Sequence, residues 1–252
     1  GEDMEFPMFI MGIHPHMFFE FLGWIAALFT MVLVRRRIGD PLSDEKRVQV
    51  ALAALFGALL GAKILAWLEH PQTTLEGLSG SPALLIGGKT VVGGLLGGMI
   101  GVEMAKKFLG INTRTGDQWV LPLAVGMSIG RLGCFFSGLD DATFGYSTSL
   151  PWGVDFGDGY TRHPTQLYEI IFIWSLMTWI NSRQHFPQGG AFRAYMVGYL
   201  WWRLLIDWLK PVDAPLLTLS AIQFACIAGL FWYHRHGVIR VKVEGTDATS
   251  EE

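Results

Sequence analysis

The chain has 252 residues, of which 51% are hydrophobic and only 16% are charged, and its mean hydropathy is +0.35. This composition is too apolar for a soluble domain of this length, and it makes lipid the main solvent of the chain. The formal net charge of -3 provides no global basic field, so nucleic acid is excluded as an expected partner.

Apolar segments long enough to cross about 30 Å of hydrocarbon recur along the chain. The first follows an acidic stretch, Gly1-Glu2-Asp3, and no small-residue cleavage site follows it, so we expect this helix to be retained. Together the segments predict an all-α membrane protein with about seven transmembrane helices. They lie near residues 17–34, 48–68, 90–109, 118–136, 166–182, 192–209 and 216–233.

Basic residues are distributed unequally between the two sides of this arrangement. Only Lys89, Arg162 and Lys210 fall near one side. The other side carries Arg35, Arg36, Arg37, Lys46, Arg47, Lys106, Lys107, Arg114, Arg183, Arg193, Arg235, Arg240 and Lys242. Because cytoplasmic loops carry the excess of Lys and Arg, the pattern predicts a multi-pass protein of the bacterial inner (cytoplasmic) membrane, with the N-terminus external and the C-terminus cytoplasmic.

The loops and tail define the expected domain organisation. Residues 1–243 are interpreted as a single polytopic membrane domain, and the polar tail 244–252 is expected to be disordered. The longest external loop, 137–165, is rich in Gly, Asp, Ser and Thr and contains Pro151-Trp152-Gly153. This composition predicts a small external headpiece of turns or short strands.

Three basic residues, Lys63, Arg131 and Arg203, lie within the apolar segments or at their ends. An ionisable group in a membrane helix costs several kcal/mol unless it meets water, an opposite charge or a polar ligand. One interpretation is an internal salt bridge, such as Arg203 with Asp207 one turn later. The other is an anionic ligand, which in a membrane is most commonly a phospholipid headgroup, because the cations lack matching acids within the apolar segments.

The two cysteines, Cys134 and Cys226, lie far apart in apolar stretches, which argues against a disulfide framework. Cys134 follows Arg131 by one helical turn, so it is either an activated thiolate or a small buried hydrophobe. No group of His, Cys or acidic residues has the sequence spacing of metal ligands, and we expect no metal or organic cofactor.

Two motifs flank the predicted headpiece. Gly130-Arg131-Leu132-Gly133 ends the fourth predicted helix, and Arg162-His163-Pro164-Thr165-Gln166-Leu167-Tyr168-Glu169 begins the fifth. Together with Pro151-Trp152-Gly153, they resemble the signature region of the prolipoprotein diacylglyceryl transferases. The resemblance extends over nearly the whole chain, through Gly87-Gly88 with Gly93-Gly94, Lys63 in place of a usual arginine, and Gly198-Tyr199 with Arg203 and Asp207.

The resemblance implies a transferase that moves the diacylglyceryl group of phosphatidylglycerol to the sulfur of a lipobox cysteine and releases glycerol phosphate. The implied partners are the membrane, phosphatidylglycerol and a lipobox-bearing preprolipoprotein or another lipid acceptor. We assign catalytic roles to Arg131, Arg203 and His163. We assign substrate binding to Arg162, Lys63, Lys89, Gln166, Tyr168, Glu169, Tyr199, Asp207, Gly93, Gly94 and Cys134.

Residue chemistry gives independent reasons for several of these roles. Tyr199, Arg203 and Asp207 are four residues apart and share one helix face, and with Arg131, Arg162 and Lys89 they are expected to converge on one headgroup. The planar arginine fork suits phosphate oxygens. Tyr168 and Trp152 can also be ordinary interfacial aromatics. The glycine run from Gly93 to Gly101 can let helices pack closely or let backbone approach a lipid.

The sequence also departs from the resembled family in residues near the expected chemistry. The histidine usual before the second glycine pair is Val92, the asparagine usual after Gly-Arg-Leu-Gly is Cys134, and an N-terminal tyrosine is Phe18. His163 can replace the missing base or can simply be a structural partner of the headpiece. The alternatives are therefore a transferase of the same fold with a non-lipoprotein acceptor, or a non-catalytic phospholipid-binding or lipid-moving membrane protein.

Overall fold

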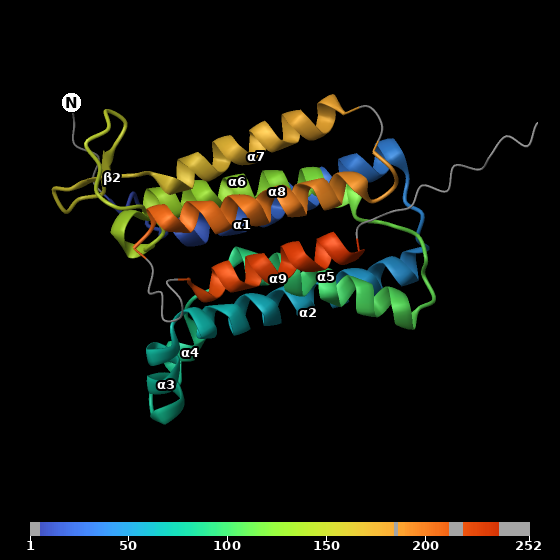
Figure 1. Ribbon diagram of the computed structural model, residues 1–252, viewed down its shortest axis with the longest axis horizontal. Helices are drawn as coiled ribbons and strands as arrows, with labels where there is room; N and C mark the ends of the chain where they lie inside the picture. Colours follow the sequence, from blue (N-terminus) through green and yellow to red (C-terminus); the bar gives the residue numbers. More distant parts are fainter. Residues whose placement is uncertain (1–5, 184–185, 212–218, 237–252) are drawn as a thin grey trace, which may run out of the picture.

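A computed structural model describes residues 6–183, 186–211 and 219–236, and these residues are mainly helical (Figure 1). The helices are α1 (Pro15–Ile38), α2 (Asp44–Glu69), α3 (Pro71–Ser79), α4 (Ala83–Ile86), α5 (Val91–Phe108), η1 (Asp117–Trp119), α6 (Val120–Ser137), η2 (Gly138–Asp140), α7 (Thr165–Ser182), α8 (Gly190–Ile206), η3 (Asp207–Leu209) and α9 (Ala221–His236). The strands are β1 (Val154–Asp155) and β2 (Thr161–Arg162). The predicted tail 244–252 lies outside the described residues.

Local sequence signals account for several helix ends. Pro15 opens α1 at a position where a missing N–H is harmless, and Gly39 ends it with a φ of 77°. The last turn of α1 carries Arg35, Arg36 and Arg37, whose charges suit the negative end of a helix dipole. The first turn of α8 is fixed from outside, because Asp117 accepts hydrogen bonds from the backbone N–H groups of Gly189 and Phe192 at 2.6 and 2.9 Å.

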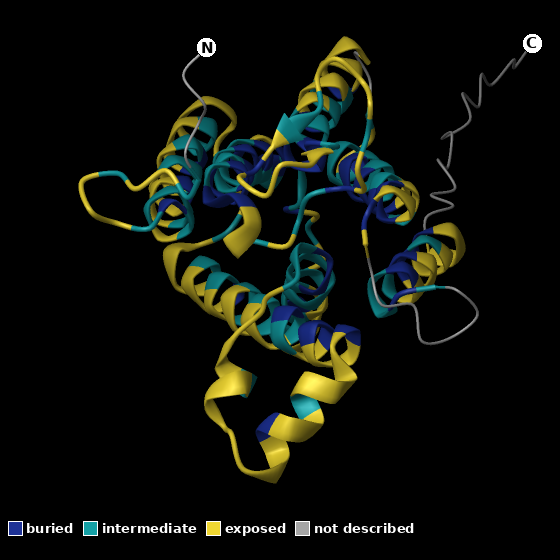
Figure 2. Cartoon of the chain, turned by 90° about the vertical axis from the view of Figure 1, so that its left-hand side faces the viewer, coloured by how far each residue is buried: buried dark blue, intermediate teal, exposed yellow. Residues whose placement is uncertain are grey.

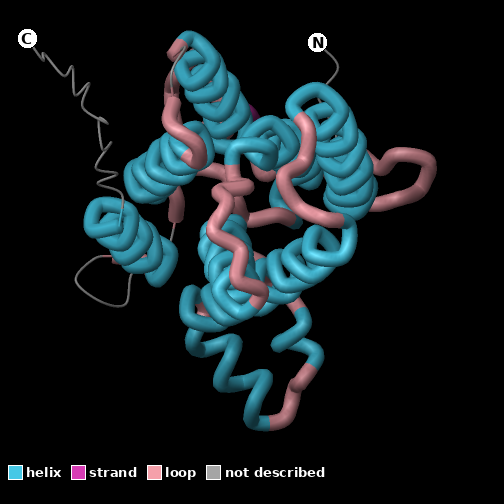
Figure 3. The backbone as a smooth tube through the Cα atoms, turned by 90° about the vertical axis from the view of Figure 1, so that its right-hand side faces the viewer, coloured by secondary structure: helices cyan, strands magenta, loops and turns pink. Residues whose placement is uncertain are grey.

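The long helices lie side by side in two groups. Figure 1 shows α1, α6, α7 and α8 above α2, α5 and α9, and Figure 3 shows the same helices nearly end-on. The helices α1 and α6 contact each other extensively, as do α2 and α5, while α8 contacts both α7 and α9. Fully buried side chains from α7, α8 and α9, including Ile173, Tyr195, Leu200 and Cys226, form the core at the junction of the two groups.

Glycine determines how closely α2 and α5 approach. A Cβ atom added to Gly97 would lie 2.2 Å from the carbonyl oxygen of Gly57, and one added to Gly93 would lie 2.3 Å from that of Gly61. The backbones therefore touch directly, which is the close approach that small residues permit in membrane helices. This contact supports the packing interpretation of the glycine run.

The surface of the helices is apolar, as expected for a membrane protein. Phe21, Phe29, Phe56 and Phe108 are 63% to 83% exposed, and Figure 2 shows exposed residues along the outer helix faces. Within the described residues, three helical segments are long and apolar enough to cross a membrane by length and composition, namely Pro15–Ile38, Asp44–Glu69 and Asp117–Asp140. The all-α membrane class is therefore confirmed. The helices α3 and α4, which occupy the segment between two predicted helices, were not predicted.

The segment 137–165 is built from turns and one short antiparallel pair. Val154 pairs with Arg162 and Asp155 with Thr161. The side chain of Asp155 accepts hydrogen bonds from three successive backbone N–H groups, at residues 157–159, and so closes the turn between the two strands. We call this segment the headpiece. It lies at the same end of the helices as α3 and α4 (Figure 1).

Candidate functional site

A buried ionic network joins α6, α7 and α8. Glu169 on α7 is 1% exposed, and its Oε1 accepts from Arg131 Nε at 2.9 Å and from the Tyr199 hydroxyl at 2.6 Å. Arg203 Nη1 lies 3.9 Å from Glu169 Oε2, and Arg203 Nη2 lies 2.9 Å from Asp207 Oδ1. The sequence-predicted residues Arg131, Glu169, Tyr199, Arg203 and Asp207 therefore do meet at one place.

The network leaves donors without partners. Among the described residues, Arg203 Nε and Nη1 are buried and make no hydrogen bond. Arg203 as a whole is 6% exposed, so these N–H groups cannot be satisfied by bulk water. A buried guanidinium with unused donors is suited to an anionic oxygen ligand such as a phosphate. The salt bridge between Arg203 and Asp207 is present as well, so the two interpretations of Arg203 are compatible.

Lys210 adds a third cation that the sequence analysis did not assign to the site. It follows η3, is 8% exposed, and interacts electrostatically with Glu169 and Asp207. Burial, then the neighbouring charges of Arg203 and Arg131, lower the pKa of Lys210 to about 7. Its place seven residues after Arg203 would put it two turns along the same face of a continuous helix, but α8 ends at Ile206. The site thus contains two arginines, two carboxylates and a lysine that is only partly protonated near neutral pH.

The headpiece holds a second group of predicted residues. His163 Nδ1 lies 3.1 Å from the Tyr168 hydroxyl, which also accepts from Trp152 Nε1 at 2.8 Å. These three side chains line a groove of about 520 Å³ together with Leu150, Pro164, Leu167, Ile171 and Leu209. The groove is largely apolar, so it suits a hydrocarbon chain or an apolar peptide segment better than a charged headgroup.

Gln166 is buried in the first turn of α7, between the headpiece and Glu169 in the sequence. Its Nε2 donates to Thr143 Oγ1 at 3.2 Å, and its Oε1 is buried without a hydrogen-bond partner among the described residues. An unpaired amide oxygen in a buried position is available to a donor on a ligand, such as a glycerol hydroxyl.

Two of the cations expected to converge on one headgroup have local partners, and their substrate-binding roles stay predictions. Arg162 pairs with Asp158 within the headpiece and stacks over Phe144, with 5.0 Å between guanidinium carbon and ring centroid. Lys89 Nζ binds Glu20 Oε1 at 2.5 Å. Each of these cations is engaged by its own neighbours, because a charged side chain close to lipid is stabilised by the nearest carboxylate.

Lys63 and the glycines also have local structural partners. The Lys63 ammonium donates to the backbone carbonyls of Ile86, Gly87 and Gly88, the last two at 2.7 and 2.9 Å. It thereby holds the loop that leads into α5. Gly93 presses against α2, and a Cβ at Gly94 would meet α2 atoms only at 3.8 Å. Their substrate-binding roles stay predictions.

Cys134 has neighbours that sequence spacing could not reveal. Arg131 Nη1 donates to its sulfur at 3.7 Å, and ligand atoms of His16, Cys134 and Asp141 all lie within 4.8 Å of one another. Burial raises the pKa of the Asp141 carboxyl, but contacts with His16 and the Cys134 thiol outweigh it and leave that pKa below its usual value. The group combines residues from α1, α6 and the start of the headpiece, so no single segment carries its signature.

Val92, at the position of the missing histidine, is 1% exposed and belongs to the hydrophobic core. The position therefore supplies neither a base nor a hydrogen bond. Whatever group removes a proton from an acceptor must come from elsewhere in the site.

Comparisons with known proteins agree with the geometry. A family model described as prolipoprotein diacylglyceryl transferase matches residues 7–234. A phosphatidylglycerol–prolipoprotein diacylglyceryl transferase of Geobacter sulfurreducens is 30% identical over 214 residues, covering 79% of this chain and 78% of the relative. One of Vibrio vulnificus is 30% identical over 241 residues, covering 86% of each chain. One of Dehalococcoides mccartyi is 27% identical over 214 residues, covering 79% of this chain and 78% of the relative.

Proposed function

The chain belongs to the prolipoprotein diacylglyceryl transferase family, and we propose that it transfers the diacylglyceryl group of phosphatidylglycerol to the sulfur of a lipobox cysteine, releasing glycerol phosphate. The observation that carries this proposal is the buried Arg131–Glu169–Arg203 network, with its unpartnered N–H donors on Arg203. A phosphodiester is an anion whose oxygens match those donors.

The same residues account for the chemistry at the leaving group. As the carbon–oxygen bond to the phosphate breaks, negative charge grows on the phosphate oxygen. Arg203, with Arg131 and Lys210 close by, stabilises that charge in a site from which bulk water is excluded. Glu169 positions the two arginines and offsets part of their mutual repulsion, so it acts as a positioning residue.

In the proposal, the apolar and polar parts of the substrates bind at different places. The apolar groove along Trp152, Tyr168 and Leu209 holds hydrocarbon or the apolar part of the lipobox segment. Gln166, with its unpaired amide oxygen, lies one turn from Glu169 on α7 and hydrogen-bonds a glycerol hydroxyl. Arg162 and His163 stabilise the headpiece, whose residues line part of the groove, and a direct role for His163 in proton transfer belongs to the same proposal.

The proposed topology follows from charge asymmetry and the position of the headpiece. Seven helices, α1, α2, α5, α6, α7, α8 and α9, cross the inner membrane as one domain within residues 1–243. The N-terminus and the headpiece are external. Arg35–Arg37 and Lys106–Lys107, which close α1 and α5, lie on the cytoplasmic side.

The function is tested with purified full chain in detergent, phosphatidylglycerol labelled in its free glycerol, and a lipobox peptide. We expect labelled glycerol phosphate and a peptide heavier by one diacylglyceryl group, both in equal amounts. A peptide with serine in place of the lipobox cysteine is the matched control. Release of label with no peptide modification would support a different acceptor, and lipid binding without any release would support a non-catalytic lipid-binding protein.

A further inference from the structure

Three potential metal ligands meet beside the ionic network. His16 lies in the first turn of α1, Cys134 in the last turn of α6, and Asp141 directly after η2. His16 Nδ1 is 3.5 Å from Asp141 Oδ2, and the ligand atoms of all three residues lie within 4.8 Å of one another. Cys134 is 8% exposed.

One of these spacings matches a zinc site, and the others are within about 1 Å of one. Bond lengths of about 2.0 to 2.3 Å in a tetrahedron place neighbouring ligand atoms roughly 3.3 to 3.7 Å apart. The His16–Asp141 distance already falls in that range. Asp141 Oδ2 is buried, and its contact with His16 Nδ1 at 3.5 Å is too long for a good hydrogen bond, so both atoms can turn to a cation placed between them.

Charge also favours a divalent ion at this place. A thiolate, a carboxylate and a neutral imidazole together carry two negative charges, so the loaded site is neutral. Arg131 lies 3.7 Å from the Cys134 sulfur, and its guanidinium is already paired with Glu169. A neutral site beside a neutralised arginine avoids the repulsion that a net positive cluster would meet.

A carboxylate lies near the second ring nitrogen of His16. Its other ring nitrogen, Nε2, lies 3.7 Å from Glu20 Oε2, and Glu20 is held by Lys89 at 2.5 Å. A metal-binding histidine commonly donates its second N–H to a carboxylate, which fixes the tautomer and the ring orientation. The pairing of Lys89 with Glu20 thereby gains a role in orienting His16.

We propose that His16, Cys134 and Asp141 bind one zinc ion and leave its fourth position open for the acceptor thiol. Three protein ligands with an open fourth position are typical of catalytic rather than structural zinc. The thiol-activating role rests on the proposed function, whereas metal binding does not. The site lies one helical turn from Arg131, so a metal-bound acceptor sulfur would be next to the donor phosphate.

The step balances without another reactant. Binding of the acceptor thiol to zinc releases its proton to solvent, since a coordinated thiol is deprotonated. The sulfur then attacks the glyceryl CH₂ group, forming the carbon–sulfur bond. The carbon–oxygen bond to phosphate breaks with its electron pair going to the phosphate oxygen, which leaves as glycerol phosphate. The thioether product is a weaker ligand than a thiolate and departs. Deprotonation of the acceptor thiol by zinc would thus replace the base that is missing at Val92.

Metal binding is tested on full chain purified in detergent, stripped with chelator and titrated with Co²⁺ alone. We expect a thiolate-to-cobalt charge-transfer band that saturates at one ion per chain and disappears when Zn²⁺ is added. Cys134→Ser and Asp141→Asn should each weaken binding by at least tenfold. Cys226→Ser is the matched control, because this cysteine is buried in α9, away from the three ligands, and should leave the band unchanged.

Two results would overturn the metal site. One is the absence of a band from a chain that still unfolds cooperatively, and the other is a band that survives Cys134→Ser. Because Cys134→Ser can perturb packing, Asp141→Asn provides the second variant, and thermal unfolding in detergent checks both.

The thiol-activating role has a separate readout. Adding the lipobox peptide to the Co²⁺-loaded chain should intensify and shift the charge-transfer band, because a second thiolate joins the metal, and the serine peptide should not. A charge-transfer band that is unchanged by the peptide would refute the role in thiol activation, but it would not affect the metal site. Transfer activity that is unchanged after complete metal removal would refute that role as well, without affecting the proposed transferase function.

Discussion

At the scale of single residues, the site is dominated by ionisable side chains held away from water. Arg131, Arg203, Glu169, Asp207 and Lys210 are each at most 8% exposed. Burying such charges is unfavourable unless they are paired, and the buried N–H groups of Arg203 that make no hydrogen bond leave room for an anionic ligand. This is why the network is better explained by a ligand than by internal pairing alone.

Lys210 makes the stability of the protein depend on pH. Its folded-state pKa of about 7 lies below the value of about 10.4 expected in an unfolded chain. Between those values unfolding takes up a proton, so stability rises as pH rises from about 7. The groups facing the ammonium are Arg203, Arg131, Glu169 and Asp207. The thermal unfolding midpoint of Lys210→Met in detergent should therefore rise less steeply between pH 7 and 9 than that of the parent chain.

The control for this measurement is Lys107→Met. Lys107 is an exposed lysine in the last turn of α5, outside the ionic network. It should keep the slope of the parent chain. Equal slopes for the parent and Lys210→Met would mean that Lys210 titrates at its ordinary pKa.

Sequence alone could identify the arginines but not their partners. Arg131 and Arg203 stand out because a guanidinium within an apolar segment is rare. Their sharing of Glu169 depends on how three helices pack, which no spacing encodes. The cluster of His16, Cys134 and Asp141 was missed for the same reason, since His16 and Cys134 lie far apart in sequence.

At the scale of secondary structure, helices were predictable because their apolar length is explicit in the sequence. The long helices of the described residues fall where apolar segments lie. The short helices α3 and α4 were missed because Pro71–Ser79 and Ala83–Ile86 are too short to produce a clear pattern. The glycine run was ambiguous until its neighbour was known, because the same residues permit packing and ligand approach.

The contact between α2 and α5 predicts different effects for two neighbouring glycines. Gly97→Ala places a methyl group 2.2 Å from a backbone carbonyl oxygen, so the helices must separate, and we expect a loss of about 1 to 3 kcal/mol. Gly94→Ala meets atoms only at 3.8 Å, so its stability should be unchanged or slightly higher. Thermal unfolding in detergent distinguishes them.

The same pair of variants separates packing from ligand contact. A stable Gly94→Ala chain that loses phosphatidylglycerol binding would show that this glycine lets backbone approach the lipid. Equal destabilisation by both substitutions would contradict the contact geometry of α2 and α5.

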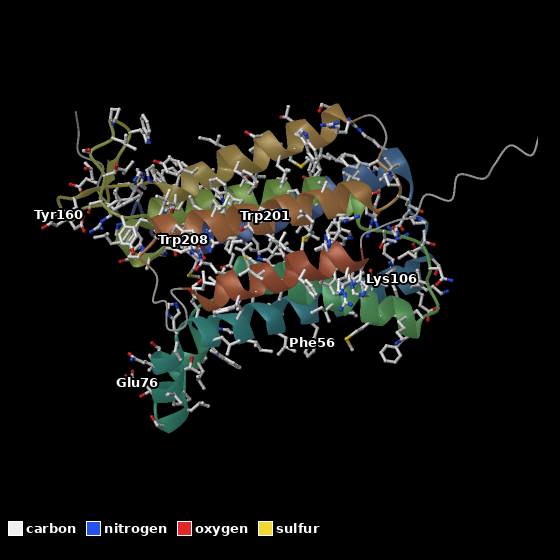
Figure 4. All side chains as sticks on the ribbon, viewed as in Figure 1. Phe56, Glu76, Lys106, Tyr160, Trp201 and Trp208 are labelled. Atoms are coloured by element: carbon white, nitrogen blue, oxygen red, sulfur yellow. The ribbon has the colours of Figure 1, made fainter. Side chains whose placement is uncertain are left out.

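At the scale of the whole molecule, the two ends of the helix assembly differ. Figure 4 places Tyr160 and Glu76 at one end and Lys106 at the other, and Trp208 lies towards the end that carries Tyr160. The headpiece, the α3–α4 segment and the network residues following α8 are thus on one side. Clusters of basic residues at the ends of α1 and α5 mark the opposite side.

This polarity predicts which positions are reached from outside the cell membrane. Tyr160→Cys, at a residue that is 63% exposed, should react with a membrane-impermeant maleimide in intact spheroplasts. Glu45→Cys, in the first turn of α2, should react only after the membrane is opened. The native cysteines are both buried, which keeps the background low. The reverse labelling pattern would invert the topology and place the headpiece in the cytoplasm.

The central claim is that the unpartnered donors of Arg203 bind the phosphate of the lipid donor. The most direct measurement compares phosphatidylglycerol binding by the parent chain, Arg203→Ala and the exposed control Lys107→Ala, using labelled lipid in detergent. The account predicts a loss on the order of 1.5 to 3 kcal/mol for Arg203→Ala, as expected for a charge-assisted hydrogen bond, and no change for the control. Unchanged lipid binding by a folded Arg203→Ala chain would contradict it and reduce Arg203 to a structural partner of Asp207.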